Sequence, residues 1–244
     1  MADPSVVHLR ESRQNAREIK FLVSAALAAP MLEWMRTNLD ADAYGTGPFH
    51  DQYATASLYF ENDRFDVFHR RCSYGKAKYR IRRYDMSPVM FLERKFRTDR
   101  LLSKRRTTVP VAEFDRLECD KPDRDWPGYW FHRRLVLRRL HPLVQVSYVR
   151  TARTFNSSQG LVRMTMDFDL RVLPLPDRAF LPGTGLPLFE GQHIVEVKYC
   201  QALPVLFRQL VEKFVLHQQP ISKFRAGLAH LGLSPDTAHG EADA

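Results

Sequence analysis

Cysteine is scarce in this chain, and the few cysteines form no recognisable framework. Cys72, Cys119 and Cys200 are spread widely through 244 residues. An odd number at such spacing builds neither a disulfide scaffold nor a zinc motif. We therefore expect a reducing compartment and a cytoplasmic protein.

Long hydrophobic runs are also missing. The longest uncharged stretch, residues 21–32, contains Pro30 and is shorter than the ~20 apolar residues that a membrane helix needs. The first residues include Asp3, Arg10 and Glu11 and carry no apolar signal core. The sequence therefore predicts no membrane segment.

Several functional motifs are absent as well. No glycine-rich phosphate loop is present, which argues against a P-loop enzyme. The nine histidines show no metal-ligand spacing, and no tandem repeat occurs. Aromatic residues do not alternate with basic ones on the polar strand faces, as a nucleic-acid stacking platform requires. We therefore expect no nucleic-acid partner.

What the chain has in excess is positive charge. Its 37 Lys and Arg outnumber 28 Asp and Glu, giving a formal net charge of +9. Such an excess attracts polyanions, whether nucleic acid, an anionic membrane or phosphorylated small molecules. The net charge alone does not indicate which of these polyanions the protein binds.

Short segments with period-two alternation dominate the chain and predict strands. They are Arg17–Val23, Ala56–Asn62, Ala77–Tyr84, Val89–Arg97, Leu102–Val109, Val144–Phe155, Leu161–Leu173 and His193–Tyr199. Helices are expected at Ser24–Leu39, at Val111–Arg139 with a break at Trp126–Gly128, and at Pro204–Gln218. We expect one α+β domain over residues 15–231, its sheet closed or nearly so, between a flexible segment 1–14 and a disordered tail 232–244.

The polar faces of these strands are unusually basic. In residues 77–84, Lys78, Arg80 and Arg82 share one face, opposite Tyr79 and Ile81. Similar rows contain Glu18 and Lys20; Glu93 and Lys95; Lys104 and Arg106; Tyr148 and Arg150; Arg163, Thr165, Asp167, Asp169 and Arg171; and Glu196 and Lys198. For any single strand, a solvated face with cross-strand ion pairs is the simpler interpretation. The concentration of Arg and Lys over the whole set favours a charged bore, neutralised by a polyanion or by the interleaved carboxylates.

Nine short motifs occur in a characteristic order. They are EIKF (18–21), SLYFEND (57–63), KYRIRRY (78–84), FLERK (91–95), SKRR (103–106), SYVRTARTF (147–155), VRMTMDFDL (162–170), VEVKY (195–199) and ISKF (221–224). From about residue 14 to 225 the chain thus resembles the VTC polyphosphate polymerase domain, a family of triphosphate tunnel metalloenzymes. The resemblance implies an eight-stranded antiparallel β-barrel tunnel with helices packed outside. It also implies ATP-driven synthesis of inorganic polyphosphate inside that tunnel.

The resemblance assigns roles by motif position. Catalytic residues would be Arg80, Arg82, Lys95, Arg150 and Lys223, and further phosphate-binding residues Lys20, Lys104, Arg163 and Lys198. Lys78 and Arg106 share the same strand faces and are added as phosphate-binding candidates. Glu196 would be the principal ligand of Mn²⁺ or Mg²⁺, with Glu18 and Asp169 as weaker candidates. From the residues alone, Lys223 would be an exposed lysine, and Glu196 equally a salt-bridge partner.

The chain departs from the wider superfamily in one motif. A common Glu-x-Glu-x-Lys opening reads Ala16, Glu18 and Lys20 here, so the first carboxylate is missing. The chain also has no counterpart of the regulatory domain and membrane helices of eukaryotic polymerases, so we expect a free-standing, bacterial-type form. Two other functions stay open: an inorganic triphosphatase or polyphosphatase in the same tunnel, and a non-catalytic polyanion-binding module.

Overall fold

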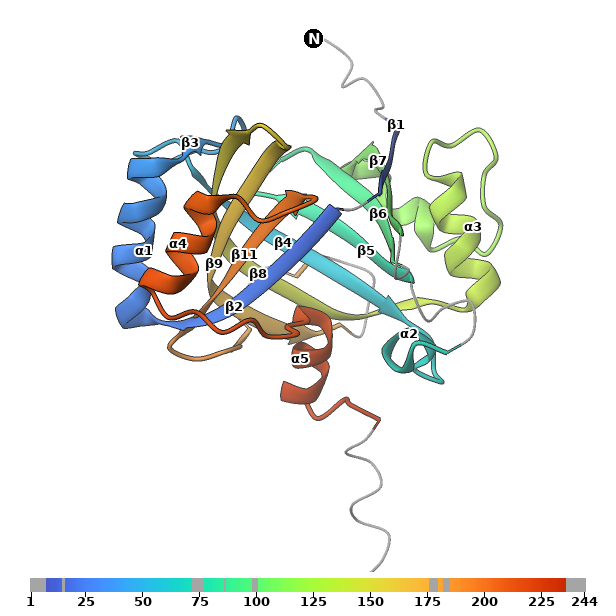
Figure 1. Cartoon of the computed structure of the whole chain (residues 1–244). Helices are drawn as coiled ribbons and strands as arrows, with labels where there is room; N and C mark the ends of the chain where they lie inside the picture. Colours follow the sequence, from blue (N-terminus) through green and yellow to red (C-terminus); the bar gives the residue numbers. More distant parts are fainter. Residues whose placement is uncertain are drawn as a thin grey trace, which may run out of the picture.

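The computed structural model describes residues 8–14, 16–71, 77–85, 87–97, 101–175, 180–181 and 185–235. Antiparallel strands dominate, and helices pack around them (Figure 1). The principal strands are β1 (His8–Gln14), β2 (Ala16–Ser24), β4 (Gln52–Glu61), β5 (Ala77–Tyr84), β6 (Val89–Arg97), β7 (Leu101–Pro110), β8 (His141–Ser157), β9 (Gly160–Pro174) and β11 (Gln192–Cys200). Two short strands, β3 (Asp40–Ala41) and β10 (Leu186–Pro187), complete the sheet.

The sheet runs in the order β1-β7-β6-β5-β4-β8-β9-β11-β2, with β3 paired to β8 and β10 to β9. All eight strands expected from the sequence are present, within a few residues of their expected ends. In the described residues no backbone pairing joins β1 to β2, the two ends of this path. The closed barrel is therefore not confirmed, although the charged faces turn inward, as shown below.

The N-terminal segment corrects one expectation. We expected residues 1–14 to form a flexible segment, yet His8–Gln14 forms β1 and pairs antiparallel with β7, His8 opposite Thr107 and Gln14 opposite Leu101. Backbone pairing needs no apolar pattern, which explains why the polar sequence HLRESRQ gave no strand signal. Residues 1–7 and 236–244 lie outside the described residues.

The helices are shorter than the sequence patterns suggested. They are α1 (Ala25–Asn38), α2 (Asp66–His69), α3 (Tyr129–Arg138), α4 (Val205–Lys213) and α5 (Lys223–His230), with a 3₁₀ helix at Val111–Leu117. The expected long helix over 111–139 thus divides into a 3₁₀ turn and α3, because Trp126–Pro127–Gly128 interrupts it. None of the helices in the described ranges is long and apolar enough to cross a membrane.

Two apolar cores hold the helices against the sheet. In one, Met31 and Met35 of α1 and Phe207 of α4 pack on Met164 and Val195 of the strands. In the other, residues of α3 and α5 join the apolar side chains of β4, β5 and β6. Figure 1 shows α1 and α4 on one side of the sheet and α3 on the opposite side. Because helices cover the apolar strand faces, the charged faces are directed into the interior.

The start of the α5 helix also reaches this interior. Its start was noted in the sequence only as the ISKF motif. Gly227 packs so closely on β9 that a Cβ atom would lie 3.0 Å from Val172 Cγ2. Phe224 stacks on Tyr59 of β4, with ring centroids 5.4 Å apart. This packing places Ser222 and Lys223 among the charged strand residues.

Candidate active site

The charged strand faces are buried, which excludes a solvated outer surface. Arg82 is 5%, Arg150 6% and Glu196 6% exposed, and Glu93 and Asp167 are almost completely buried. We call this cluster the basic interior. It contains eleven cations, Lys20, Lys78, Arg80, Arg82, Lys95, Lys104, Arg106, Arg150, Arg163, Lys198 and Lys223, with five carboxylates, Glu18, Asp42, Glu93, Asp167 and Glu196. Six positive charges therefore lack a carboxylate to balance them.

Glu93 on β6 is the most heavily paired carboxylate. Arg80 Nε lies 2.6 Å from Oε2, while Arg106 Nε lies 2.6 Å and Lys104 Nζ 3.1 Å from Oε1. Burial alone would raise the pKa of Glu93, but the surrounding cations hold it well below its usual range. Glu93 is therefore ionised and neutralises part of the charge on its two neighbouring strands, β5 and β7.

Asp167 on β9 is the second buried carboxylate. Arg150 donates to both of its oxygens, at 2.6 and 2.8 Å, and Lys223 Nζ lies 2.6 Å from Oδ2. Burial would raise the pKa of Asp167, but Arg150 and Lys223 outweigh it and lower the pKa to about 2. A lysine that the sequence alone would leave on the surface is thus buried beside a strand carboxylate.

The third group of ion pairs in the basic interior contains two carboxylates, Glu18 on β2 and Glu196 on β11. Lys20 Nζ lies 2.9 Å from Glu18 and 3.6 Å from Glu196, and Lys198 Nζ lies 2.6 Å from Glu196. Lys95 of β6 reaches Glu18 at 3.0 Å. Because β2 and β6 do not pair, this contact spans the interior and shows that the sheet curls around it.

Two cations of the interior bind neutral groups rather than carboxylates in the described part of the chain. Arg82 donates from Nε to Ser57 Oγ and from Nη2 to Tyr148 OH, both at 3.0 Å. Lys78 Nζ lies 3.0 Å from Ser222 Oγ. Their charges are the least compensated, so they are well suited to an incoming anion.

Arg163 lies at the edge of the cluster. Its Nε donates to Asp42 Oδ2 at 2.8 Å, and its Nη2 donates to Tyr53 OH at 2.7 Å. Tyr53 in turn packs edge-on against Tyr84, whose hydroxyl accepts a hydrogen bond from Arg106. Two tyrosines in ring contact therefore connect Arg163 with Arg106.

Burial and neighbouring cations shift the pKa values of several groups in the basic interior. Burial lowers the pKa of Lys78 and of Lys104 to about 8, although Tyr59 opposes the change at Lys78 and Glu93 at Lys104. Burial would raise the pKa of Tyr84, but Arg82 and Arg106 outweigh it and lower the pKa to about 7. An anion entering the interior would relieve this repulsion.

One candidate from the sequence lies elsewhere. Asp169 was expected on the same face as Arg163 and Asp167, but its side chain is 57% exposed and pairs with Arg171. It adopts φ of +49°, and the register of β8 against β9 shifts between Ser147 and Val149, next to this position. This irregularity breaks the alternation on which the expectation rested. The structure brings the other thirteen candidates together.

Sequence reasoning also passed over two central residues. Glu93 and Asp167 appeared in the alternating rows but received no role, because neither is assigned one by the motifs. The signal that could have identified them is their position opposite basic residues: Glu93 faces Arg80 and Arg106 in the ladders, and Asp167 faces Arg150. Such pairs form only once the strand order is known.

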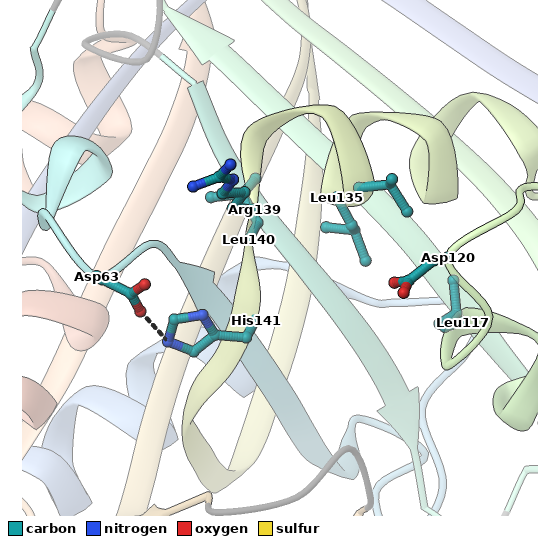
Figure 2. Close-up of a pocket in the computed structure, with 8 residues that line it drawn as sticks. Asp63, Leu117, Asp120, Leu135, Arg139, Leu140 and His141 are labelled. Atoms are coloured by element: carbon teal, nitrogen blue, oxygen red, sulfur yellow. Dashed lines mark ion pairs between the residues drawn. The ribbon is translucent and has the colours of Figure 1, made fainter.

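Two open cavities lie outside the basic interior. One of ≈ 270 Å³ lies beside the end of α3, lined by Asp63, Arg139 and His141 among others (Figure 2). A second of ≈ 600 Å³ lies over α1, lined partly by Arg36 and Phe49. None of the candidate residues lines either cavity.

The carboxylates of Glu18 and Glu196 fit a divalent cation. In the described ranges no cluster of three or more His, Cys, Asp or Glu could hold a metal. Mg²⁺, however, is commonly bound by one or two carboxylates together with substrate phosphates and water. Glu18 and Glu196 supply two carboxylates with a lysine ammonium group between them. Such oxygen ligands suit Mg²⁺ or Mn²⁺.

The chain is similar to several solved structures. A proposed adenylate cyclase from Bacillus halodurans shares 16% identity over 87% of this chain and 95% of its own, with a TM-score of 0.54. A proposed adenylyl cyclase from Hippeastrum, described as having a dominant triphosphatase activity, shares 14% identity over 91% of this chain and 98% of its own, with a TM-score of 0.43. No match was found among curated proteins.

The Bacillus halodurans structure therefore shares the fold of this chain. The family model of the VTC domain matches residues 15–232. The chain belongs to the VTC domain family.

Proposed function

We propose that the protein is a polyphosphate polymerase, which transfers the γ-phosphate of ATP to a growing chain of inorganic polyphosphate. The observation that carries this proposal is the excess of cations in the basic interior, eleven against five carboxylates, supplied by nearly every strand. A charge excess of this size in a largely enclosed space is costly unless an anion with several charges neutralises it. A phosphate chain is such an anion.

The spacing of the cations suits an extended anion. Lys78, Arg80 and Arg82 repeat at every second position of β5, so they extend over roughly 13 Å at ~3.3 Å per residue. Arginine grips phosphate oxygens in pairs, while lysine acts as a point charge that can follow a moving chain. These properties support binding of both ATP and the acceptor in one row.

The protein contributes little covalent chemistry to this reaction. An oxygen of the terminal phosphate attacks the γ-phosphorus of ATP in line, the bond to the β-phosphate oxygen breaks, and ADP leaves. A terminal phosphate is largely ionised at neutral pH, since its last pKa is ≈ 6. No general base is needed, which agrees with carboxylates that are all committed to ion pairs. The basic side chains stabilise the charge that develops on the transferred group.

A divalent cation would complete this site. Glu196 and Glu18 would hold it, and when bound it would neutralise charge on the phosphate oxygens. Lys20 lies between these carboxylates and would have to shift toward the phosphates. The remaining cations bind and orient the two substrates.

The proposal is tested by incubating purified protein with ATP and Mg²⁺ or Mn²⁺ and separating the products by length on a gel stained for polyphosphate. Long chains and ADP are expected, and both should be lost in Arg80→Ala and Glu196→Gln. Arg208→Ala, an exposed residue of α4, is the matched control and should retain activity. Free phosphate without chains would assign a triphosphatase instead. Tight polyphosphate binding without turnover would assign a binding module.

A further inference from the structure

Glu93 lies at the centre of a cross-strand row of charges. It is directly opposite Arg80 on β5 and directly opposite Arg106 on β7. Side chains directly opposite one another on one face have Cβ atoms about 4.5–5.5 Å apart, so the three must interact. Without the carboxylate, this row would place two arginines on either side of a neutral position.

The contacts fix the orientation of the cations as well as their charge. Arg80 and Arg106 both donate their Nε–H to Glu93, each at 2.6 Å. A planar guanidinium group anchored through Nε can no longer rotate freely. Lys104 is held by the same carboxylate at 3.1 Å.

We propose that Glu93 is a positioning residue, which holds Arg80, Lys104 and Arg106 in place for a phosphate chain before that chain arrives. The identity of the ligand rests on the proposed function; the positioning rests on the contacts above. Ordering three long side chains at the moment of binding costs conformational entropy for each of them. A residue that orders them in advance raises affinity by removing that cost.

Lys104 supplies a signature that a purely structural role would not give. The ionisable groups that face it are Glu93 on β6, Arg106 on β7, and Arg80 and Tyr84 on β5. Burial, Arg106 and Arg80 lower the pKa of Lys104, while Glu93 and Tyr84 raise it. Removing the charge of Glu93 would therefore make Lys104 lose its proton at lower pH.

The test is calorimetric binding of inorganic triphosphate, with a chelator present to prevent turnover, between about pH 6 and about pH 9. In Glu93→Gln we expect affinity to fall about tenfold at neutral pH. We also expect the loss of affinity at alkaline pH to begin at lower pH than in the wild type. Glu93→Asp keeps the charge and should recover part of both properties, and it replaces Glu93→Gln if that variant fails to fold.

Asp51→Asn is the matched control. Asp51 is completely buried and pairs with Arg36 and Arg153, outside the basic interior. Loss of the Asp51 charge should lower the stability of the fold without changing the affinity for triphosphate or the pH profile of that affinity. A folded Glu93→Gln variant with wild-type affinity and pH profile would overturn the positioning role alone. Absence of triphosphate binding by the wild type would overturn the proposed function and the positioning role together.

Discussion

The ammonium group of Lys223, at the start of α5, lies 2.6 Å from the carboxylate of Asp167 on β9. It also lies 4.9 Å from the ring centroid of Tyr148. Lys223 is therefore both a structural tie between α5 and the sheet and a candidate ligand for phosphate.

Lys223→Met should weaken triphosphate binding and stability together. Asp167 keeps its two bonds to Arg150 but loses one of its cations, so we expect a loss of about 1–3 kcal/mol in unfolding free energy. Affinity should fall about tenfold, because one phosphate-binding charge is removed. Urea unfolding and calorimetry measure the two effects. Lys213→Met, an exposed residue of α4, should change neither.

Asp167 should contribute stability that is lost in acid. Its folded pKa is about 2, below the ordinary value of 3.8, because Arg150 and Lys223 outweigh the effect of burial, which would raise it. The folded state therefore binds its proton less readily than the unfolded chain. The contribution is fully present above about pH 4 and disappears as pH falls toward about 2, and is worth about 2 kcal/mol. Unfolding of Asp167→Asn should depend less on pH in this window; an unchanged slope would contradict the assignment.

Triphosphate binding should weaken as pH rises from about 7 to about 9. Burial lowers the pKa of Lys78 and of Lys104 to about 8, so both lose positive charge in this range. Tyr84, whose pKa is about 7, gains negative charge there, since Arg82 and Arg106 outweigh its burial. In Tyr84→Phe only the lysine steps remain, so calorimetry should show the decline starting at higher pH. Tyr44→Phe, at an exposed tyrosine, should behave as the wild type.

The strand positions were predictable from the sequence because alternation depends only on neighbours in the chain. Lys78, Arg80 and Arg82 share a face in any strand that contains them. Partners across strands depend on strand order and register, which alternation does not contain. The pairing of Lys95 with Glu18, from strands that are not neighbours, could not be predicted for this reason.

Local irregularity limited the sequence prediction further. Asp169 follows the same alternation as Arg163 and Asp167, yet the register shift and its positive φ turn it to the surface. The polar β1 lacked the apolar signal that identifies a strand. Lys223 was placed through its family motif, since only the packing of Phe224 and Gly227 carries it inside.

Thr165→Val should not destabilise the fold. Thr165 is 2% exposed and its Oγ1 has no hydrogen-bond partner in the part of the chain that the structure describes. A methyl group of the same shape removes this unsatisfied group, so unfolding free energy should be unchanged or higher by up to about 1 kcal/mol. Thr151→Val is the control, because Thr151 Oγ1 accepts a bond from Gln52, and it should lose about 1 kcal/mol. Equal losses in urea unfolding would contradict this difference.

Glu196 and Asp169 should differ sharply in their effect on metal-dependent turnover. Glu196 is buried beside Glu18, whereas Asp169 is exposed and pairs with Arg171. We expect Glu196→Gln to lose at least about tenfold in rate with Mg²⁺, and Asp169→Asn to keep wild-type activity. A chelator should lower the turnover rate of the wild type toward that of Glu196→Gln. It should change the rate of that variant little, because the carboxylate acts by holding the metal. A chelator effect of equal size in both would place the metal away from Glu196, and equal loss in Asp169→Asn would return the surface carboxylate to the site.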